Sequence, residues 1–328
     1  MYDDSDERTA LQMNRSKPLA VICTILFTCA PTIQAQTAPT RPKILGISHV
    51  GFFVSDLPRA LDFWSVLLGY EVSTEDKNPD GSLTDLILKI NNHQFVELLN
   101  LQPPAGSGRL GHIAFTVSSA KQMRRYLISR GVRVASPVLK NVITGDLTLT
   151  IKDPDGNLVE FDEPQPDGLE ARTDGKPLPA THISDSIYHL GFLVGNSEKS
   201  IKFYGDLLGF HEFWRGSSNG TQLSWIDMQV PDGKDYVEFT LYRDLPPPDK
   251  RGSQEHISLL VPDVAKSISI LESRPAYQTY GKPLAPHTGV NGKRQVNLFD
   301  PDGTRVELME SATANGKPVP PSTAPPPN

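Results

Sequence analysis

The stretch ISHVGFFV at residues 47–54, followed by a helical segment that ends in LLG at 67–69, decides the fold. The pattern returns as IYHLGFLV at 187–194, with a second helical segment that ends in LLG at 207–209. The two histidines are 189 − 49 = 140 positions apart, and the two glycines are 209 − 69 = 140 positions apart. One fixed offset over so long a stretch indicates a duplication, so we expect two copies of one module.

Each module is predicted to contain two strand–helix–strand–strand–strand units. In the first module, the histidine strand and the helix ending at Gly69 precede strands around 70–75, 83–90 and 94–99. A second unit has a strand at 111–117, a helix at 119–130 and strands around 132–135, 147–152 and 158–161. The sequence therefore predicts an α+β fold of two tandem modules, each of paired βαβββ units that form a curved mixed sheet around a cleft.

The predicted boundaries follow from this repeat. Module 1 covers residues 44–163 and module 2 covers 187–310. Residues 164–186 are rich in Pro, Gly, Asp and Thr without any period, which is typical of a linker. Residues 311–328 are crowded with proline and are predicted to be a disordered tail. The Asp-Pro-Asp-Gly stretches at 153–156 and 300–303 are interpreted as tight turns, since the further ligands of a calcium loop are missing.

Composition limits the classes of function. The 328 residues suffice for two domains of roughly 100–200 residues each. A hydrophobic content of 38% and a charged content of 21% are typical of globular proteins. The formal net charge of −6 gives no basic footprint, so nucleic acid and anionic membrane surfaces are not expected as partners. We expect a small-molecule substrate and a monomer or homodimer.

Residues 1–35 have the features of a secretory signal peptide. Arg15 and Lys17 precede an apolar run over 19–30, which is shorter than the ~20 residues that span a bilayer, and small residues such as Ala35 follow. Because the first twelve residues are acidic, Met13 is a candidate for the true start. Cleavage after Ala35 predicts a periplasmic or secreted protein with no membrane span after signal removal.

Both cysteines lie within this segment, so the mature part is expected to be free of disulfides. Lipid attachment at Cys29 is an alternative, although the three residues before it are a poor lead-in. A buried N-terminal helix is a further alternative for this segment.

Each module carries a histidine near the start of each half and a glutamate in the last strand of each half. If the halves pair into one curved sheet, the four side chains of a module can point into one concavity. Two imidazoles and two carboxylates suit a divalent metal such as Zn, Ni, Mn or Fe. The candidate metal ligands are His49, Glu97, His112 and Glu160 in module 1, and His189, Glu238, His256 and Glu307 in module 2.

A structural explanation has to be weighed against this one. A glutamate between apolar residues is most often on the solvent face of a strand, and a single histidine at a strand start is usually structural. However, the set occurs twice at equivalent positions, whereas His93, His182, His211 and His287 have no counterpart in the other module. This repetition favours at least one metal site.

These residues resemble the vicinal oxygen chelate superfamily, which includes glyoxalase I, bleomycin resistance proteins, methylmalonyl-CoA epimerase and the extradiol dioxygenases. The resemblance rests on HVGFFVSDL at 49–57, on LLGY at 67–70 and on DPDGNLVEF at 153–161, and it covers most of 47–310. Such a fold hosts several chemistries, so the resemblance specifies the fold more closely than the reaction.

By this resemblance, a His/Glu/His/Glu set implies chemistry similar to that of glyoxalase I. The metal would stabilise an enolate, and Glu160 or Glu307 would be the catalytic base. We therefore expect an isomerase or lyase acting on a small carbonyl compound. Export argues against glyoxalase I itself, because its thiol cofactor is chiefly intracellular.

Two alternatives remain open. The extradiol dioxygenases hold Fe(II) with two histidines and one glutamate, which His189, His256 and Glu307 would match, with Glu238 as the departure. A metal-free binding protein of the bleomycin-resistance type would instead need an apolar groove, for which Phe213, Trp225 and Tyr236 are candidates that core packing explains equally well.

The pairing of the ligands also remains open. A site in this superfamily forms inside one module or between halves of two modules. His49 and Glu97 could therefore pair with His112 and Glu160, or with His256 and Glu307.

Overall fold

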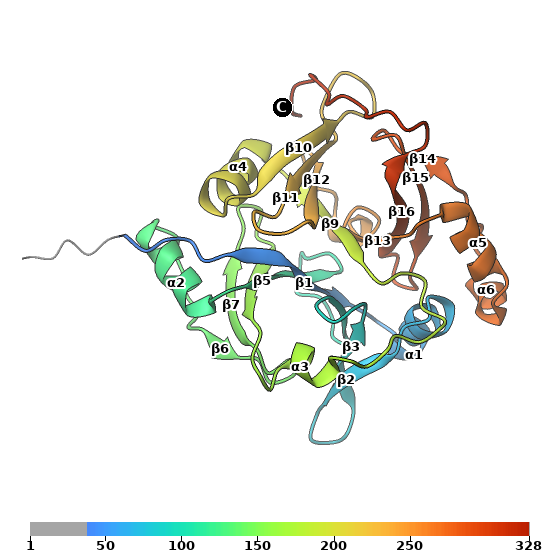
Figure 1. Cartoon of the computed structure of the whole chain (residues 1–328), viewed down its shortest axis with the longest axis horizontal. Coiled ribbons are helices and arrows are strands. Elements are labelled where there is room, and N and C mark those ends of the chain that lie inside the picture. Colours follow the sequence, from blue (N-terminus) through green and yellow to red (C-terminus); the bar gives the residue numbers. More distant parts are fainter. Residues whose placement is uncertain (1–37, 328) are drawn as a thin grey trace, which may run out of the picture. The chain divides into compact units, whose positions relative to one another are not determined.

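The computed structural model describes residues 38–327, which form two eight-stranded mixed sheets with few helices (Figure 1). The first sheet has the strand order β2-β3-β4-β1-β5-β8-β7-β6, and the second has the order β10-β11-β12-β9-β13-β16-β15-β14. Adding eight to each strand number of the first sheet gives the order of the second, so the two sheets have the same topology. The predicted α+β fold of two tandem modules is confirmed.

The elements of module 1 follow the predicted order closely. Its strands are β1 (Ile44–Phe53), β2 (Val72–Lys77), β3 (Leu83–Lys89), β4 (Phe95–Leu99), β5 (Leu110–Val117), β6 (Leu139–Lys140), β7 (Leu147–Lys152) and β8 (Leu158–Glu163). Its helices are α1 (Leu57–Leu61), the π-helix η1 (Asp62–Leu67) and α2 (Ala120–Ser129), and α3 (Leu169–Thr173) follows β8.

Module 2 repeats this order. Its strands are β9 (Ile187–Val194), β10 (His211–Gly216), β11 (Trp225–Gln229), β12 (Tyr236–Leu241), β13 (His256–Leu260), β14 (His287–Thr288), β15 (Lys293–Phe299) and β16 (Arg305–Thr313). Its helices are α4 (Ser197–Ile201), the π-helix η2 (Lys202–Leu207), the 3-10 turn η3 (Pro248–Lys250), α5 (Val264–Glu272) and α6 (Pro275–Tyr280).

The first helix of each module differs from the regular helix that the apolar spacing predicts. Asp56 caps α1 by accepting a hydrogen bond from the backbone N–H of Arg59. The chain then widens into η1, in which the N–H of Leu68 donates to the carbonyl of Phe63, five residues earlier. Gly69 ends the segment with a φ of 86°, as its position after the helix predicts.

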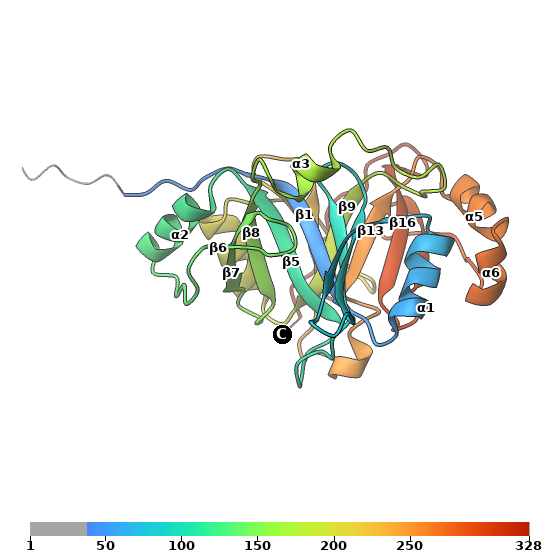
Figure 2. The same cartoon turned by 90° about the horizontal axis from the view of Figure 1, so that it is seen from below.

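One hydrophobic core runs through both modules. Phe115 of β5 packs edge-on against Phe210 of the second module, with 5.2 Å between ring centroids. Phe63 of η1 similarly packs against Tyr280 of α6 at 5.9 Å, and Figure 2 shows α1 beside α6. Each module therefore packs a helix against the other module.

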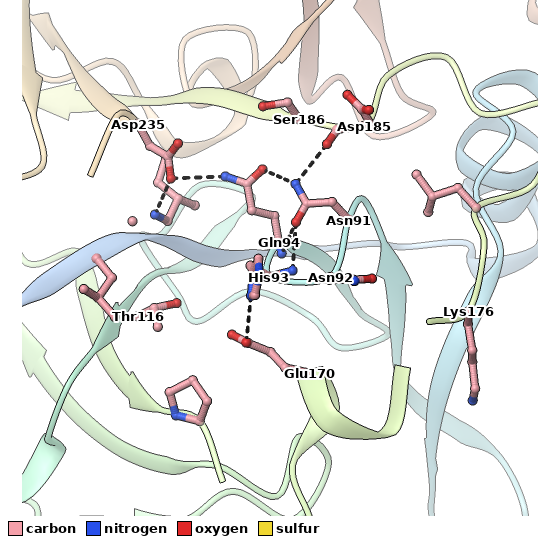
Figure 3. A pocket seen from close by; sticks show the side chains of 15 residues that line it. Asn91, Asn92, His93, Gln94, Thr116, Glu170, Lys176, Asp185, Ser186 and Asp235 are labelled. Carbon is pink, nitrogen blue, oxygen red and sulfur yellow. Dashed lines mark hydrogen bonds and ion pairs between the residues drawn. The ribbon is translucent and has the colours of Figure 1, made fainter. Parts of the chain in front are cut away.

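Polar contacts between the modules are reciprocal. The side-chain oxygen of Gln94 accepts a hydrogen bond from the N–H of Ile187 at 2.8 Å, and Asp235 accepts one from the N–H of Ile47 at 2.8 Å. Gln94 and Asp235 occupy corresponding positions, and they also contact each other at 3.2 Å (Figure 3). The two modules are thus related by an approximate two-fold symmetry.

Three predicted segments differ from the structure. Val132 and Val134 alternate with exposed residues like a strand, but 132–135 forms no strand, and the two-residue β6 follows instead. The predicted linker contains α3. In the predicted tail, β16 continues to Thr313, and the N–H of Leu223 donates to the carbonyl of Pro325.

The predicted signal peptide at 1–35, including Met13 and Cys29, lies outside the described residues. Among the described residues, the helices are all too short or too polar to cross a membrane.

Candidate metal centres

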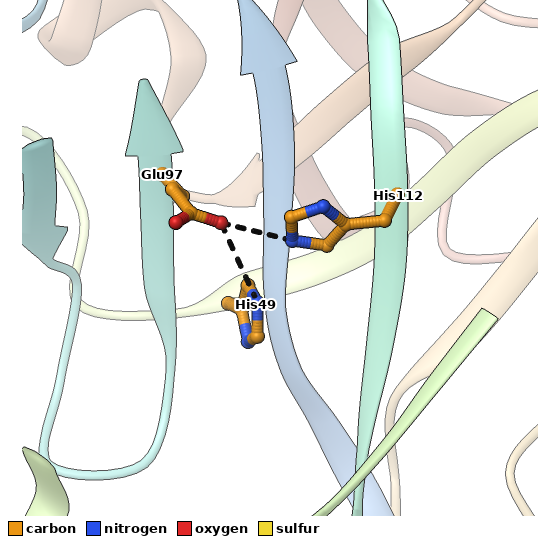
Figure 4. A group of neighbouring side chains, drawn as sticks. All are labelled: His49, Glu97 and His112. Atoms are coloured by element: carbon orange, nitrogen blue, oxygen red, sulfur yellow. Dashed lines mark ion pairs between the residues drawn. The ribbon is translucent and has the colours of Figure 1, made fainter. Parts of the chain in front are cut away.

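The first cluster lies on three neighbouring strands of the first sheet. β1 lies between β4 and β5, and Gly51 of β1 is in register with Glu97 on one side and His112 on the other. The Nε2 atom of His112 is 3.0 Å from the carboxylate of Glu97, and the Nε2 atom of His49 is 3.8 Å from the same oxygen (Figure 4). Two imidazoles and one carboxylate thus converge on one point.

The glycine two residues after each motif histidine makes room for the second imidazole. A Cβ atom on Gly51 would lie 2.4 Å from the ring of His112, and one on Gly191 would lie 1.8 Å from the ring of His256. Neither distance is sterically possible. The His-x-Gly pattern of the repeat is therefore explained by the packing of an imidazole against the backbone of the neighbouring strand.

Two further carboxylates of β8 complete the first cluster. Glu160 lies 4.0 Å from Nε2 of His49, and its other oxygen accepts a hydrogen bond from Thr150. Asp162 lies 3.2 Å from Nδ1 of His49. Asp162 was not among the predicted ligands, although side-chain alternation places it on the same face of the strand as Glu160.

The charges of the first cluster are strongly coupled. Burial alone would lower the pKa of His49, but Asp162, Glu97 and Glu160 together raise it to about 9. Burial alone would raise the pKa of Glu97, but His112 and His49 hold it below its usual value. Without a cation, His49 therefore carries a proton and a positive charge at neutral pH. A divalent cation would take the place of this proton and favour the charged carboxylates in the same way, so the donor set fits a metal.

A cover from the segment after β8 closes the first cluster. Leu169 of α3 packs against Ile87 and Phe95 of the sheet. Beside it, Glu170 lies 2.8 Å from Nδ1 of His93, a contact that Figure 3 shows. The cavity next to His49 under this cover measures only about 10 Å³. A substrate therefore has almost no room at the first cluster.

The second cluster also contains two imidazoles, which face each other through their Nε2 atoms. The Nε2 atoms of His189 and His256 are 3.0 Å apart. Glu307 lies 3.5 Å from Nε2 of His189, and Glu238 lies 3.6 Å from Nε2 of His256. Two nitrogens at ~2.1 Å from one metal ion, seen at about a right angle, would be ~3.0 Å apart, so this spacing fits a shared cation.

The protonation of His256 also suits ligation. Its Nδ1 atom lies 2.9 Å from the carbonyl of Gln254, and the tautomer with the proton on Nδ1 satisfies this acceptor and places the lone pair on Nε2. Nη2 of Arg305 lies 3.0 Å from the same Nε2, so a bound metal would take the place of this contact. Burial, and next the charge of Arg305, lower the pKa of both His256 and His189 well below the usual value. Both rings are thus neutral, as metal ligation requires.

The second cluster opens into a cavity of about 260 Å³. Its walls include the two glutamates of the cluster, Trp214, Trp225 and Arg305. The sequence predicted Trp225 as a groove residue, whereas Trp214 and Arg305 were missed. Phe213 is half exposed, and Tyr236 packs against His189 and does not line this cavity.

Two positions on the last strand distinguish the clusters chemically. Arg305 stands where module 1 has Leu158, and Met309 stands where module 1 has Asp162, because both pairs share the offset 305 − 158 = 309 − 162 = 147. The first cluster therefore has an extra carboxylate, and the second has a guanidinium.

The carboxyl groups in and next to the second cluster have raised pKa values. Burial raises the pKa of Glu238 to about 8, with a further contribution from Glu307. Asp227 lies opposite Glu238 on β11, and burial with the charge of Glu238 raises its pKa well above the usual value. A bound cation would displace such protons.

All eight predicted ligands thus lie in two clusters, each within one module. The described residues contain three compact groups of possible metal ligands, and each group is confined to one sheet. The alternative set of His49 and Glu97 with His256 and Glu307 is not brought together. Buried Oε2 of Glu307 has no hydrogen-bond partner among the described residues, as expected of an atom that faces a ligand. Metal binding itself stays a prediction.

Comparison with known proteins agrees with the two-module fold. The family described as the Glyoxalase/Bleomycin resistance protein/Dioxygenase superfamily matches residues 46–161 and 186–308, which is most of both modules. An uncharacterised protein of Bacillus subtilis, YwkD, is 28% identical over 115 residues, which cover 33% of this chain and 89% of that protein.

Two solved structures share the two-module fold. The 2,3-dioxygenase LapB from Pseudomonas sp. KL28 has a TM-score of 0.63 at 15% identity, with 86% of this chain and 98% of that chain covered. Homoprotocatechuate 2,3-dioxygenase from Brevibacterium fuscum, in complex with 3,4-dihydroxyphenylacetate, has a TM-score of 0.60 at 21% identity, with 89% and 87% covered.

Proposed function

Because this chain belongs to the Glyoxalase/Bleomycin resistance protein/Dioxygenase superfamily, we propose that it is an exported, divalent-metal-dependent enzyme that acts on a small oxygen-bearing substrate in module 2. The observation that carries the proposal is the cavity of about 260 Å³ that reaches Glu238 and Glu307. The corresponding space in module 1 is closed by α3, so the first cluster would hold a metal without turnover.

The proposed chemistry is an isomerase or lyase step at a carbon next to a carbonyl group. His189 and His256 would hold the metal through Nε2, and Glu238 would complete this compact group. When bound, the metal supplies a Lewis acid that polarises the carbonyl oxygen of the substrate.

Glu307 is the proposed base. Its Oε2 atom is buried, borders the cavity and has no hydrogen-bond partner among the described residues, so it can accept a proton from the substrate carbon. Burial raises the pKa of Glu307, which makes it a stronger base than an exposed glutamate. Trp214 and Trp225 would keep water away from this step.

Ring-cleaving dioxygenation is the second candidate. Two dioxygenases share the fold, and His189, His256 and Glu307 provide the two histidines and one carboxylate that hold Fe(II) in non-haem oxygenases. Glu238 would then be a surplus carboxylate next to the metal. This fourth group favours the isomerase or lyase reaction.

Elemental analysis tests the proposal. The mature protein would be purified from the periplasm without chelator, and metal per chain would be measured. About two equivalents of Zn, Ni or Mn would support two His/Glu clusters and the isomerase or lyase reaction. One equivalent of iron, together with oxygen consumption when catechol is added, would instead support the dioxygenase reaction. A protein without metal that takes up none on titration would overturn both and leave a small-molecule binding protein.

A further inference from the structure

Four buried polar atoms without a hydrogen-bond partner among the described residues belong to side chains that line the cavity of module 2. They are the donors Nε1 of Trp214 and Nε of Arg305, and the acceptors Oδ1 of Asn297 and Oε2 of Glu307. Unpaired buried polar atoms cost free energy, so native proteins usually satisfy them with a ligand, water or ion. Their gathering around one cavity indicates a polar ligand with both acceptor and donor groups.

Arg305 is the group that distinguishes this cavity from its counterpart. It lies on β16 two residues before Glu307, and side chains two residues apart share a face of a strand. Its guanidinium rests against the imidazole of His256, with Nη2 2.7 Å from Nδ1 and 3.0 Å from Nε2. Module 1 has the uncharged Leu158 at this position. At this position of the last strand, a guanidinium therefore occurs in the module that has room for a substrate and an uncharged side chain in the other.

We infer that the substrate is a small 2-oxo- or 2-hydroxy-carboxylate, whose carboxylate pairs with Arg305 while its adjacent oxygen faces the imidazoles of His189 and His256. This inference rests on the proposed function, because it assigns the substrate class of the same site. A guanidinium presents a planar fork of N–H donors that matches the two oxygens of a carboxylate.

The remaining walls agree with this class. A cavity of about 260 Å³ lies below the ~300–1,000 Å³ that hold drug-sized ligands, so substrates as large as a peptide adduct or a nucleotide do not fit. Trp214 and Trp225 provide flat, largely apolar surface for the body of the molecule. Asn297 lies opposite Glu307 in the sheet, and its Oδ1 atom can accept a hydrogen bond from a hydroxyl group of the substrate.

Binding of matched charged and neutral compounds tests the inference. Mandelate and lactate would be compared with mandelamide and lactamide by calorimetry on the metal-loaded full chain. We expect both acids to bind at least about tenfold more tightly than their amides, because a charge-assisted contact is lost in the amide. Arg305→Met should weaken the binding of mandelate by about tenfold or more and leave the binding of mandelamide unchanged. Arg305→Lys, which keeps the charge without the fork, should recover part of the affinity.

Arg243→Met removes an exposed guanidinium elsewhere and is the control. Equal affinity of acid and amide for the native chain, or full mandelate affinity in Arg305→Met, would overturn the inference. The metal content of each variant is measured alongside. Mandelate binding that depends on Arg305 in a chain that takes up no metal would support the inference about the anion and refute the proposed metal enzyme. Metal uptake with no preference for the acids would support the proposed metal enzyme and refute the inference about the anion.

Discussion

Asp302 of module 2 accepts a hydrogen bond from the backbone N–H of Ser55 in module 1, with 2.8 Å between Oδ2 and N. The matching contact has the modules exchanged: Asp155 of module 1 accepts a hydrogen bond from the backbone N–H of Gly195 in module 2, at 2.9 Å. Asp302 also pairs with Arg109 at 2.9 Å, and its side chain is only 3% exposed. The two Asp-Pro-Asp-Gly turns therefore hold the modules together, in addition to turning the chain.

Asp302→Ala is expected to lower the free energy of unfolding by roughly 2–3 kcal/mol, because it removes charge-assisted hydrogen bonds from a buried carboxylate and leaves Arg109 unpaired. Urea unfolding of the full chain measures the change. Asp206→Ala, at an exposed position, is the control. An Asp302→Ala protein as stable as the native one would show that the turns do not hold the interface.

Gly191→Ala should remove about one equivalent of metal per chain, since a Cβ atom there would lie 1.8 Å from the ring of His256 and displace the ligand. Gly51→Ala should do the same at the first cluster, and the two effects should add. Elemental analysis provides the measurement. Gly205→Ala is a suitable control, because the nearest atoms to its Cβ lie 3.6 Å away. Full metal content in both variants would refute the assignment of His112 and His256 as ligands.

Glu238→Ala separates the two candidate reactions. If Glu238 is a ligand, as its distance of 3.6 Å from His256 suggests, the variant should lose the metal of module 2 and its turnover. If His189, His256 and Glu307 hold the metal instead, the variant should keep its metal, with only a weaker affinity for it. Glu198→Ala removes an exposed carboxylate and controls for general effects of charge. An unchanged rate together with unchanged metal content would exclude Glu238 as a metal ligand.

Leu169→Ala should uncover the first cluster. The side chain is 2% exposed and packs on Ile87 and Phe95, so its truncation should cost about 2–4 kcal/mol of unfolding free energy. A chelator should then remove the metal of module 1 several times faster, whereas the metal of module 2 should leave at its native rate. Leu101→Ala, at a half-exposed position, is the control. Equal release rates in the native chain and Leu169→Ala would show that α3 is no barrier.

Asp300→Asn should change how stability depends on pH. Burial raises the pKa of Asp300 from 3.8 to about 6, so folding favours its protonated form. This contribution to stability is fully present below about pH 3.8 and is lost as the pH rises through about 6. The decline of unfolding free energy between about pH 4 and pH 7 should therefore shrink by roughly 2 kcal/mol in the variant. Urea unfolding at both pH values tests this, and an unchanged decline would contradict it.

The repeat explains which parts of the fold and site were predictable from the sequence. Positions that both modules need recur at equivalent places of the repeat and stand out for that reason. Examples are Gly51 and Gly191, and the eight candidate ligands, whose offsets run from 189 − 49 = 140 to 307 − 160 = 147. Asp162, Arg305 and Trp214 were missed by the same criterion, because they occur in one module only. These residues make the two clusters differ, and a search for similarity between modules cannot find them.

Other features depend on contacts that no local pattern records. α3 lies in a segment without apolar periodicity, and its position comes from the packing of Leu169 on the sheet. The proline-rich tail is placed by backbone hydrogen bonds such as that from Leu223 to Pro325. The widening of the first helix into η1 changes the hydrogen-bond spacing from four to five residues without disturbing the buried face.

The reciprocal contacts between Gln94 and Asp235 and their neighbours have the form of an isologous interface, in which the same surface of two subunits is used twice. In a homodimer, a mutation would appear in both active sites at once. Covalent fusion of the two halves removes this constraint, because each copy can then accumulate its own changes. Asp162 facing a closed site and Arg305 facing an open one are such changes, so the chain can be understood as a dimer whose subunits have become free to specialise.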